Sequence, residues 1–134
     1  MPLSTNSALV LTCAVATGLV LASRSLAQDR EAGAVVFNKC LPCHAVGEGA
    51  KNKVGPVLNG LEGRRAGTVE GYAYTGANKS SGIVWNEAAF KEYIRNPRAR
   101  IPGTKMFFAG ITNETDIANL WAYLRQFGPD GKVK

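Results

Sequence analysis

The pentapeptide Cys40-Leu41-Pro42-Cys43-His44 is the most informative segment of this chain. Two cysteines separated by two residues and followed directly by a histidine form the attachment pattern of a c-type haem. Two residues between the thiols span one edge of a porphyrin, so thioethers from Cys40 and Cys43 tether it. The adjacent imidazole of His44 then lies under the metal as its proximal ligand. The pattern predicts one covalently bound haem c.

The sequence also contains one candidate for a second ligand of the haem iron. His44 is the only histidine, and Met106 is the only methionine apart from the initiator. Haem iron is held by a histidine and a methionine in one large class of electron-transfer proteins. We therefore expect His44 and Met106 to be the two metal ligands.

Other uses of the two cysteines fit the sequence less well. A redox dithiol of the thioredoxin type is expected within a βαβ unit, whereas these flanks are helical and then rich in glycine. Structural zinc needs four ligands, and no second Cys or His pair follows. A disulfide between cysteines this close together would be strained.

The first 27 of the 134 residues have the pattern of a secretory signal peptide. Ala8 to Ala22 is almost wholly apolar but shorter than the roughly 18 residues of a membrane-spanning helix. Small residues at Ser25 and Ala27 favour cleavage before Gln28. No Lys or Arg precedes the apolar segment, so an uncleaved anchor is the alternative. We expect a signal peptide over 1–27, a single domain over 28–134 and a periplasmic location.

The chain is basic, with 16 Lys and Arg against 10 Asp and Glu. This charge is compatible with nucleic acid, an anionic membrane or an acidic protein as partner. The sequence has no basic run and none of the aromatic-plus-basic motifs of nucleic-acid-binding modules. An acidic protein surface is therefore the favoured partner, and no nucleic acid is expected.

Hydrophobic periodicity predicts helices and no strand of convincing length. The first helix is expected from Arg30 to Leu41, and the second over 87–95, capped by Asn86 and ended by Pro97. The last helix is expected over 113–127, with Gly128 at its C′ position. Residues 75–80 are expected to form one short helical turn.

Long loops connect these helices. Nine glycines lie between residues 47 and 82, and neither helical nor strand periodicity persists there. Residues 98–110 form a second expected loop, which carries Met106. The sequence predicts an all-α fold whose long loops wrap around a bound group.

The chain resembles the class I cytochromes c, specifically the group of mitochondrial cytochrome c and bacterial cytochrome c2. Six segments carry the resemblance in order, at 40–44 (CLPCH), 55–64 (GPVLNGLEGR), 71–79 (GYAYTGANK), 82–85 (GIVW), 102–110 (PGTKMFFAG) and 120–124 (LWAYL). Bacterial relatives have a cleavable signal, so the resemblance is to the cytochrome c2 side of the group. It implies a small fold in which the N- and C-terminal helices cross.

The resemblance also implies roles for individual residues. The carbonyl of Pro56 accepts a hydrogen bond from the proximal histidine, as partners of metal-bound histidines commonly do. Arg64, Tyr74 and Trp85 hold the haem propionates, and Asn78, Tyr93 and Thr104 form a network beside the sulfur of Met106. Trp85 and Tyr93 could instead be core aromatics, and Arg64 a solvated charge.

The implied function is single-electron transfer by a soluble, monomeric carrier that is not an enzyme. The resemblance implies a cytochrome bc1 complex as electron donor and a photosynthetic reaction centre or cytochrome oxidase as acceptor. The expected docking residues are Lys39, Lys51, Lys53, Arg98, Lys105 and Phe108. A haem peroxidase, a cytochrome subunit of a dehydrogenase and a membrane-anchored cytochrome are the alternatives.

Overall fold

The computed structural model describes residues 28–134, so the predicted signal peptide over 1–27 lies outside the described residues. The helices are α1 (Arg30–Phe37), α2 (Gly76–Ser80), α3 (Glu87–Arg95), α4 (Pro97–Arg100) and α5 (Glu114–Arg125). Strand pairing within the described residues is limited to two isolated bridges, Arg65 with Val84 and Phe127 with Val133. The all-α prediction is confirmed.

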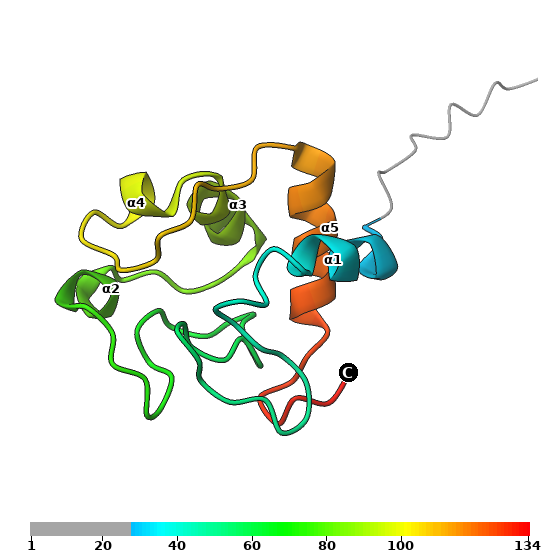
Figure 1. Cartoon of the computed structure of the whole chain (residues 1–134), viewed down its shortest axis with the longest axis horizontal. Helices are drawn as coiled ribbons and strands as arrows, with labels where there is room; N and C mark the ends of the chain where they lie inside the picture. Colours follow the sequence, from blue (N-terminus) through cyan, green and yellow to red (C-terminus); the bar gives the residue numbers. More distant parts are fainter. Residues whose placement is uncertain (1–27) are drawn as a thin grey trace, which may run out of the picture.

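The N- and C-terminal helices α1 and α5 cross and pack together, as predicted (Figure 1). The ring of Phe37 lies 5.3 Å from the ring of Tyr123. Gly33 allows the close approach, since a Cβ atom there would lie 2.0 Å from the carbonyl oxygen of Asn119. The Asn119 side chain accepts a hydrogen bond of 2.9 Å from the backbone N–H of Asp29, at the start of α1.

The helix boundaries follow local capping. Asp29, Asn86 and Asn113 each accept a backbone N–H with their side chain at the start of α1, α3 and α5. Thr75 does the same for α2, which is the short turn that the sequence predicts. These side chains satisfy N–H groups that have no partner inside the helix.

Three boundaries differ from the sequence prediction. Helix α1 ends at Phe37, and the chain continues through Leu41 in tighter turns instead of α-helix. Helix α4 begins at Pro97 and takes up the first residues of the segment 98–110 predicted as loop, because Asn96 caps it and proline fits well in a first turn. Helix α5 ends at Arg125, so Gly128 is not its C′ residue and belongs to the following turn.

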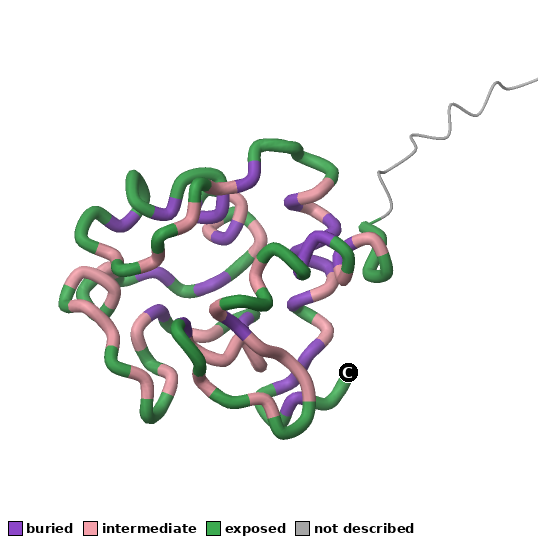
Figure 2. The backbone as a smooth tube through the Cα atoms, in the orientation of Figure 1, coloured by how far each residue is buried: buried purple, intermediate pink, exposed green. Residues whose placement is uncertain are grey.

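Long loops between α1 and α3 make up most of the remaining fold (Figure 1). Their residues are a mixture of half-buried and exposed ones, whereas many of the buried residues lie on α3, α5 and the segments that face them (Figure 2). The core centres on Ile117, Leu120, Trp121 and Leu124 of α5. The loops therefore form the wall of a cavity, and the helices form its back.

Candidate functional site

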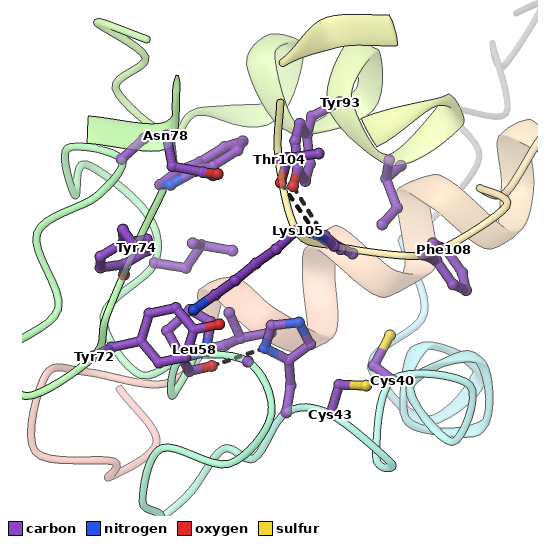
Figure 3. A pocket seen from close by; sticks show the side chains of 18 of the residues that line it. Cys40, Cys43, Leu58, Tyr72, Tyr74, Asn78, Tyr93, Thr104, Lys105 and Phe108 are labelled. Atoms are coloured by element: carbon purple, nitrogen blue, oxygen red, sulfur yellow. Dashed lines mark hydrogen bonds between the residues drawn. The ribbon is translucent and has the colours of Figure 1, made fainter. Parts of the chain in front are cut away.

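The two cysteines and His44 lie in consecutive turns that follow α1. The N–H groups of Cys43 and His44 both donate to the carbonyl of Cys40, at 3.0 and 2.8 Å. These turns hold both thiols and the imidazole against one cavity (Figure 3). The two cysteines form no disulfide with each other.

The imidazole of His44 is buried and oriented by the next loop. Its Nδ1 donates to the carbonyl of Pro56 at 2.7 Å, which leaves Nε2 as the ring nitrogen available to a metal. Burial lowers the pKa of His44, so the ring is neutral, the form in which imidazole binds metals. A Cβ atom on Gly55 would lie 2.4 Å from Cε1 of His44, so glycine is needed beside the ring.

Met106 enters the cavity from the loop between α4 and α5. The hydroxyl of Tyr93 donates to its sulfur at 3.1 Å, and its backbone N–H donates to the hydroxyl of Thr104 at 3.3 Å. Figure 3 shows Tyr93, Thr104 and Asn78 together on the side of the cavity opposite the two cysteines. Burial raises the pKa of Tyr93, which keeps its phenol protonated as the donor.

The structure brings the predicted haem-contacting residues together around this one cavity. Its lining includes Cys40, Cys43, His44, Pro56, Arg64, Tyr74, Asn78, Trp85, Tyr93, Thr104 and Met106. Of the predicted docking residues, Lys39, Lys105 and Phe108 also line it, whereas Lys51, Lys53 and Arg98 do not. Segments far apart in sequence therefore converge on one site.

Arg64 shows that the cavity suits an anionic group. Its guanidinium donates to the carbonyls of Val57 and Asn59 at 3.2 and 2.7 Å through a single nitrogen. Burial lowers the pKa of Arg64, and among residues 28–134 it takes part in no ion pair. Arg64 is half-buried, and a cation that is partly removed from water is stabilised by a counter-charge, which the carboxylates of a haem would supply. These contacts favour a partner of the bound group over a fully solvated charge, and the residues present fit haem c.

The geometry disfavours the other uses of the cysteines. Reactive thiols have a lowered pKa, whereas burial raises the pKa of Cys40 to about 11. Within the part of the chain that the structure describes, His, Cys, Asp and Glu form no cluster of three or more that could hold a metal ion. A redox dithiol and a structural zinc site therefore lack support.

Several residues at this site were missed from the sequence. Gly55 was visible only as the residue before Pro56, and nothing signalled its contact with His44. Tyr72 donates its hydroxyl to the carbonyl of Val54 at 2.7 Å, and the ammonium group of Lys105 lies 4.5 Å from the centre of its ring. Lys105 also donates to the carbonyl of Ala73, so it links the methionine loop to the loop before α2.

The two adjacent phenylalanines of the methionine loop differ in exposure. Phe108, which we expected at the docking surface, is half-buried and packs against the core. Phe107, which the sequence analysis did not single out, is 83% exposed. A loop without periodicity gives no sequence signal that distinguishes the exposure of the two rings, and the docking role of Phe108 stays a prediction.

Among the helices of residues 28–134, none combines the length and the apolar character that crossing a bilayer requires.

Comparisons with known proteins agree with this site. Residues 30–128 match the family model described as cytochrome c. The chain is 69% identical over 107 residues to a cytochrome c2 of Rhodoplanes tepidamans, a match covering 80% of this chain and 100% of the relative. It is 67% identical over 103 residues to cytochrome c-550 of Bradyrhizobium diazoefficiens, covering 77% and 76%.

A solved structure supports the same assignment. Cytochrome cH from Methylobacterium extorquens superimposes with a TM-score of 0.68 at 40% identity, covering 72% of this chain and 96% of that one. Cytochromes c carry a covalently bound haem c, and Cys40 and Cys43 have the spacing that attaches it. The chain therefore belongs to the cytochrome c family, as an electron-transport haem protein of the class I bacterial cytochrome c2 group.

Proposed function

We propose that this chain is a periplasmic, monomeric single-electron carrier. It takes electrons from a cytochrome bc1 complex and delivers them to a photosynthetic reaction centre or a cytochrome oxidase. It is not an enzyme, since its residues hold a redox group and transform no substrate. The observation that supports this most is the cavity in which the imidazole of His44 and the thioether of Met106 accompany two attachment cysteines.

His44 and Met106 are the proposed metal ligands. The Pro56 carbonyl fixes the tautomer of His44, so its Nε2 lone pair is available. The Tyr93 hydroxyl and the Thr104 side chain restrict the position of Met106 from two directions. A methionine ligand and burial both favour the ferrous state, so the reduction potential is expected to be positive.

Arg64, Tyr74 and Trp85 are the proposed partners of the haem carboxylates. The backbone N–H of Val69 donates to the Tyr74 hydroxyl at 3.2 Å, which leaves the phenolic proton available as a donor. Burial raises the pKa of Tyr74, so this proton is retained at neutral pH. The three side chains thus offer hydrogen-bond donors and one positive charge to an anionic group bound in the cavity.

Bound haem c supplies the chemistry, which is the gain and loss of one electron at its iron. The protein supplies ligands, orientation and exclusion of water. Leu61, Ala66, Phe90 and Ile94 are buried residues of the cavity wall and keep it apolar. Low polarity around a redox centre limits solvent rearrangement and raises its potential.

Basic residues around the cavity are the proposed electrostatic docking site. Lys39 and Lys105 line it, Lys51 and Lys53 are exposed on a neighbouring loop, and Arg98 is exposed on α4. Lys53 donates to the Leu41 carbonyl, and Lys39 lies 3.9 Å from Asp116. Exposed charges of one sign raise the rate at which an acidic partner arrives, which suits a carrier that must bind and leave quickly.

Electron exchange with purified complexes tests this function. Holoprotein should be reduced by a bacterial cytochrome bc1 complex given quinol, and oxidised by illuminated reaction centres or by cytochrome oxidase. Slow azide binding to the ferric protein is expected if Met106 occupies the sixth position, whereas fast binding would favour a peroxidase. Periplasmic recovery with Gln28 as the first residue would exclude the anchored form, and failure to exchange with any of the complexes would contradict the proposal.

A further inference from the structure

We propose that Phe107, held in place by the guanidinium of Arg98, is the apolar anchor through which this chain binds its redox partner. The partner fitted to this pair is a protein whose surface has an apolar socket bordered by carboxylates. This inference rests on the proposed function and identifies the residues that supply affinity at the docking site, beyond the general attraction of the lysines.

Phe107 is the most exposed large apolar side chain among those of residues 28–134, with 83% of its surface accessible. It directly follows Met106 and is one of the residues that line the cavity. Its neighbours Met106 and Phe108 pack against the core, so the backbone of this loop is anchored on both sides of the exposed ring. Single exposed apolar residues are common on protein surfaces, so the exposure of Phe107 alone does not indicate a binding role. The residues around it must provide the further evidence.

The Phe107 ring is contacted by Arg98 of helix α4. Its guanidinium carbon lies 5.5 Å from the centre of the Phe107 ring, within the range of a cation–π contact. Such a contact restricts the ring before any partner arrives. Restricting a side chain in advance lowers the entropy cost of binding. Phe107 is therefore a preorganised side chain that points away from the core.

The positive charge of Arg98 also remains available. Its neighbours Arg95 and Arg100 pair with Glu114 and Glu92 at 2.7 and 3.1 Å. Within residues 28–134, Arg98 takes part in no ion pair. One face of its guanidinium contacts the ring of Phe107, so its N–H groups can still donate to a carboxylate of the partner.

The surroundings favour an acidic protein as the occupant. Val54, 73% exposed, lines the same cavity and adds a second apolar contact, while Lys39 and Lys105 line the cavity as cations. An apolar centre with a charged rim is the usual arrangement of a protein-binding hot spot. A membrane-surface protein would instead present one amphipathic helix with a continuous apolar face, and these residues come from separate loops.

The test measures KM for the holoprotein as substrate of a purified bacterial cytochrome bc1 complex, at low and at high salt. Phe107→Ser should raise KM about tenfold at both salt concentrations. Burial of an aromatic ring contributes at least a tenfold gain in affinity, and salt does not screen this apolar contribution. Phe107→Leu, which keeps apolar area, should recover most of this loss. Val35→Ser is the matched control, since Val35 is 68% exposed on α1 and does not line the cavity.

Substitutions of Arg98 distinguish the contribution of its charge to KM from that of its planar guanidinium group. Arg98→Lys keeps the charge and should retain the salt dependence of KM, yet it should still raise KM because an ammonium group is a poorer planar partner for the ring. Arg98→Gln should raise KM mainly at low salt. In the double variant with Phe107→Ser, the effect of Arg98→Lys should disappear, since the ring it positions is absent.

Equal KM values for Phe107→Ser and Val35→Ser would overturn the inference. The inference would also be overturned if Phe107→Ser kept the parent's KM with the complex and weakened only binding to phosphatidylglycerol vesicles. That result would mean that Phe107 contacts a membrane and not a protein. The sulfur-to-iron absorption band of each variant must match that of the parent, so that a change in KM reports docking and not the iron site. If the parent itself is not reduced by the complex, the proposed function fails, and this outcome is distinct from the failure of one variant.

Discussion

Met106 is the residue on which the properties of the proposed iron site depend most. Three contacts define its position: the Tyr93 hydroxyl on its sulfur, the Thr104 side chain on its N–H, and packing against the core. No other residue after the initiator offers a thioether. This single side chain therefore has no substitute within the cavity.

Met106→Ala should leave the haem attached, because the thioethers to Cys40 and Cys43 are untouched, but it should open the sixth position. The potential should fall, since a thioether favours ferrous iron more than water does. Absorbance of the ferric protein and a redox titration measure both effects. Tyr93→Phe is a useful control, because it removes only the hydrogen bond to the sulfur and should keep the sulfur-to-iron band. A Met106→Ala protein with the parent's band and potential would exclude Met106 as a ligand.

Arg64 is a half-buried positive charge that lines the cavity, and its removal should lower the reduction potential. Ferric iron carries one more positive charge than ferrous iron, so a nearby cation favours the reduced state. We expect Arg64→Gln to lower the potential by an energy on the order of 1 kcal/mol, which corresponds to tens of millivolts for one electron. Arg64→Lys keeps the charge and should restore most of the potential, although it loses hydrogen bonds to Val57 and Asn59. Equal potentials in the parent and Arg64→Gln would show that Arg64 does not act on the haem.

At the scale of elements, the crossing of α1 and α5 fixes where the attachment cysteines lie. Gly33 sits at the closest point, and the tertiary hydrogen bond from Asp29 to Asn119 secures the start of α1. Phe37 and Tyr123 pack together at the next turn. Since Cys40 follows α1 by a single turn, any shift of this helix moves the first attachment point.

Gly33→Ala tests this helix crossing, because the sign of the change in the free energy of unfolding depends on how closely the two helices pack. In an exposed helix, Gly→Ala stabilises by up to about 1 kcal/mol. At Gly33 the added Cβ would lie 2.0 Å from a backbone carbonyl, so we expect a net destabilisation of about 1–3 kcal/mol. Denaturant unfolding measures it as a lower midpoint with an unchanged slope.

Gly76→Ala is the matched control for this experiment. Gly76 begins α2, and a Cβ atom there would meet nothing within 4 Å. We expect it to be neutral or slightly stabilising. If Gly33→Ala behaved in the same way, the close packing of the two helices would not limit stability.

The sequence predicted the helices well and their contacts only partly. Amphipathic stripes and capping residues located α3 and α5, because these signals are local. The haem attachment pattern and the six matching segments identified the residues that now line one cavity. The Gly33 contact with Asn119 depends on residues 86 positions apart, and nothing local encodes it. The exposure of Phe107 in place of Phe108 depends on how an irregular loop turns, which hydrophobic periodicity cannot report.

At the scale of the whole molecule, the sequence carries a net charge of +6, and charge near the cavity should matter more than charge elsewhere. Lys53→Glu and Lys132→Glu change the net charge equally, and both lysines are exposed. Lys53 lies on the loop that borders the cavity, whereas Lys132 lies in the C-terminal turn. The two substitutions therefore separate local from overall electrostatics.

Lys53→Glu should slow electron transfer with the bc1 complex several-fold more than Lys132→Glu at low ionic strength. At roughly 0.15 M, where the Debye length is about 8 Å, the difference should shrink. Stopped-flow rates at a series of salt concentrations measure this. Equal slowing by both substitutions would contradict a localised docking surface and leave only a net-charge effect.

The proposed function requires that the cavity hold a haem c through His44 and Met106 and that this haem exchange single electrons. A potentiometric titration of the purified holoprotein, followed by absorbance, tests it most directly. We predict one transition with the slope of a single electron, a positive midpoint, and a sulfur-to-iron band that is present in the oxidised protein and lost on reduction. A midpoint below zero, a two-electron slope, or an oxidised protein without that band would contradict the claim.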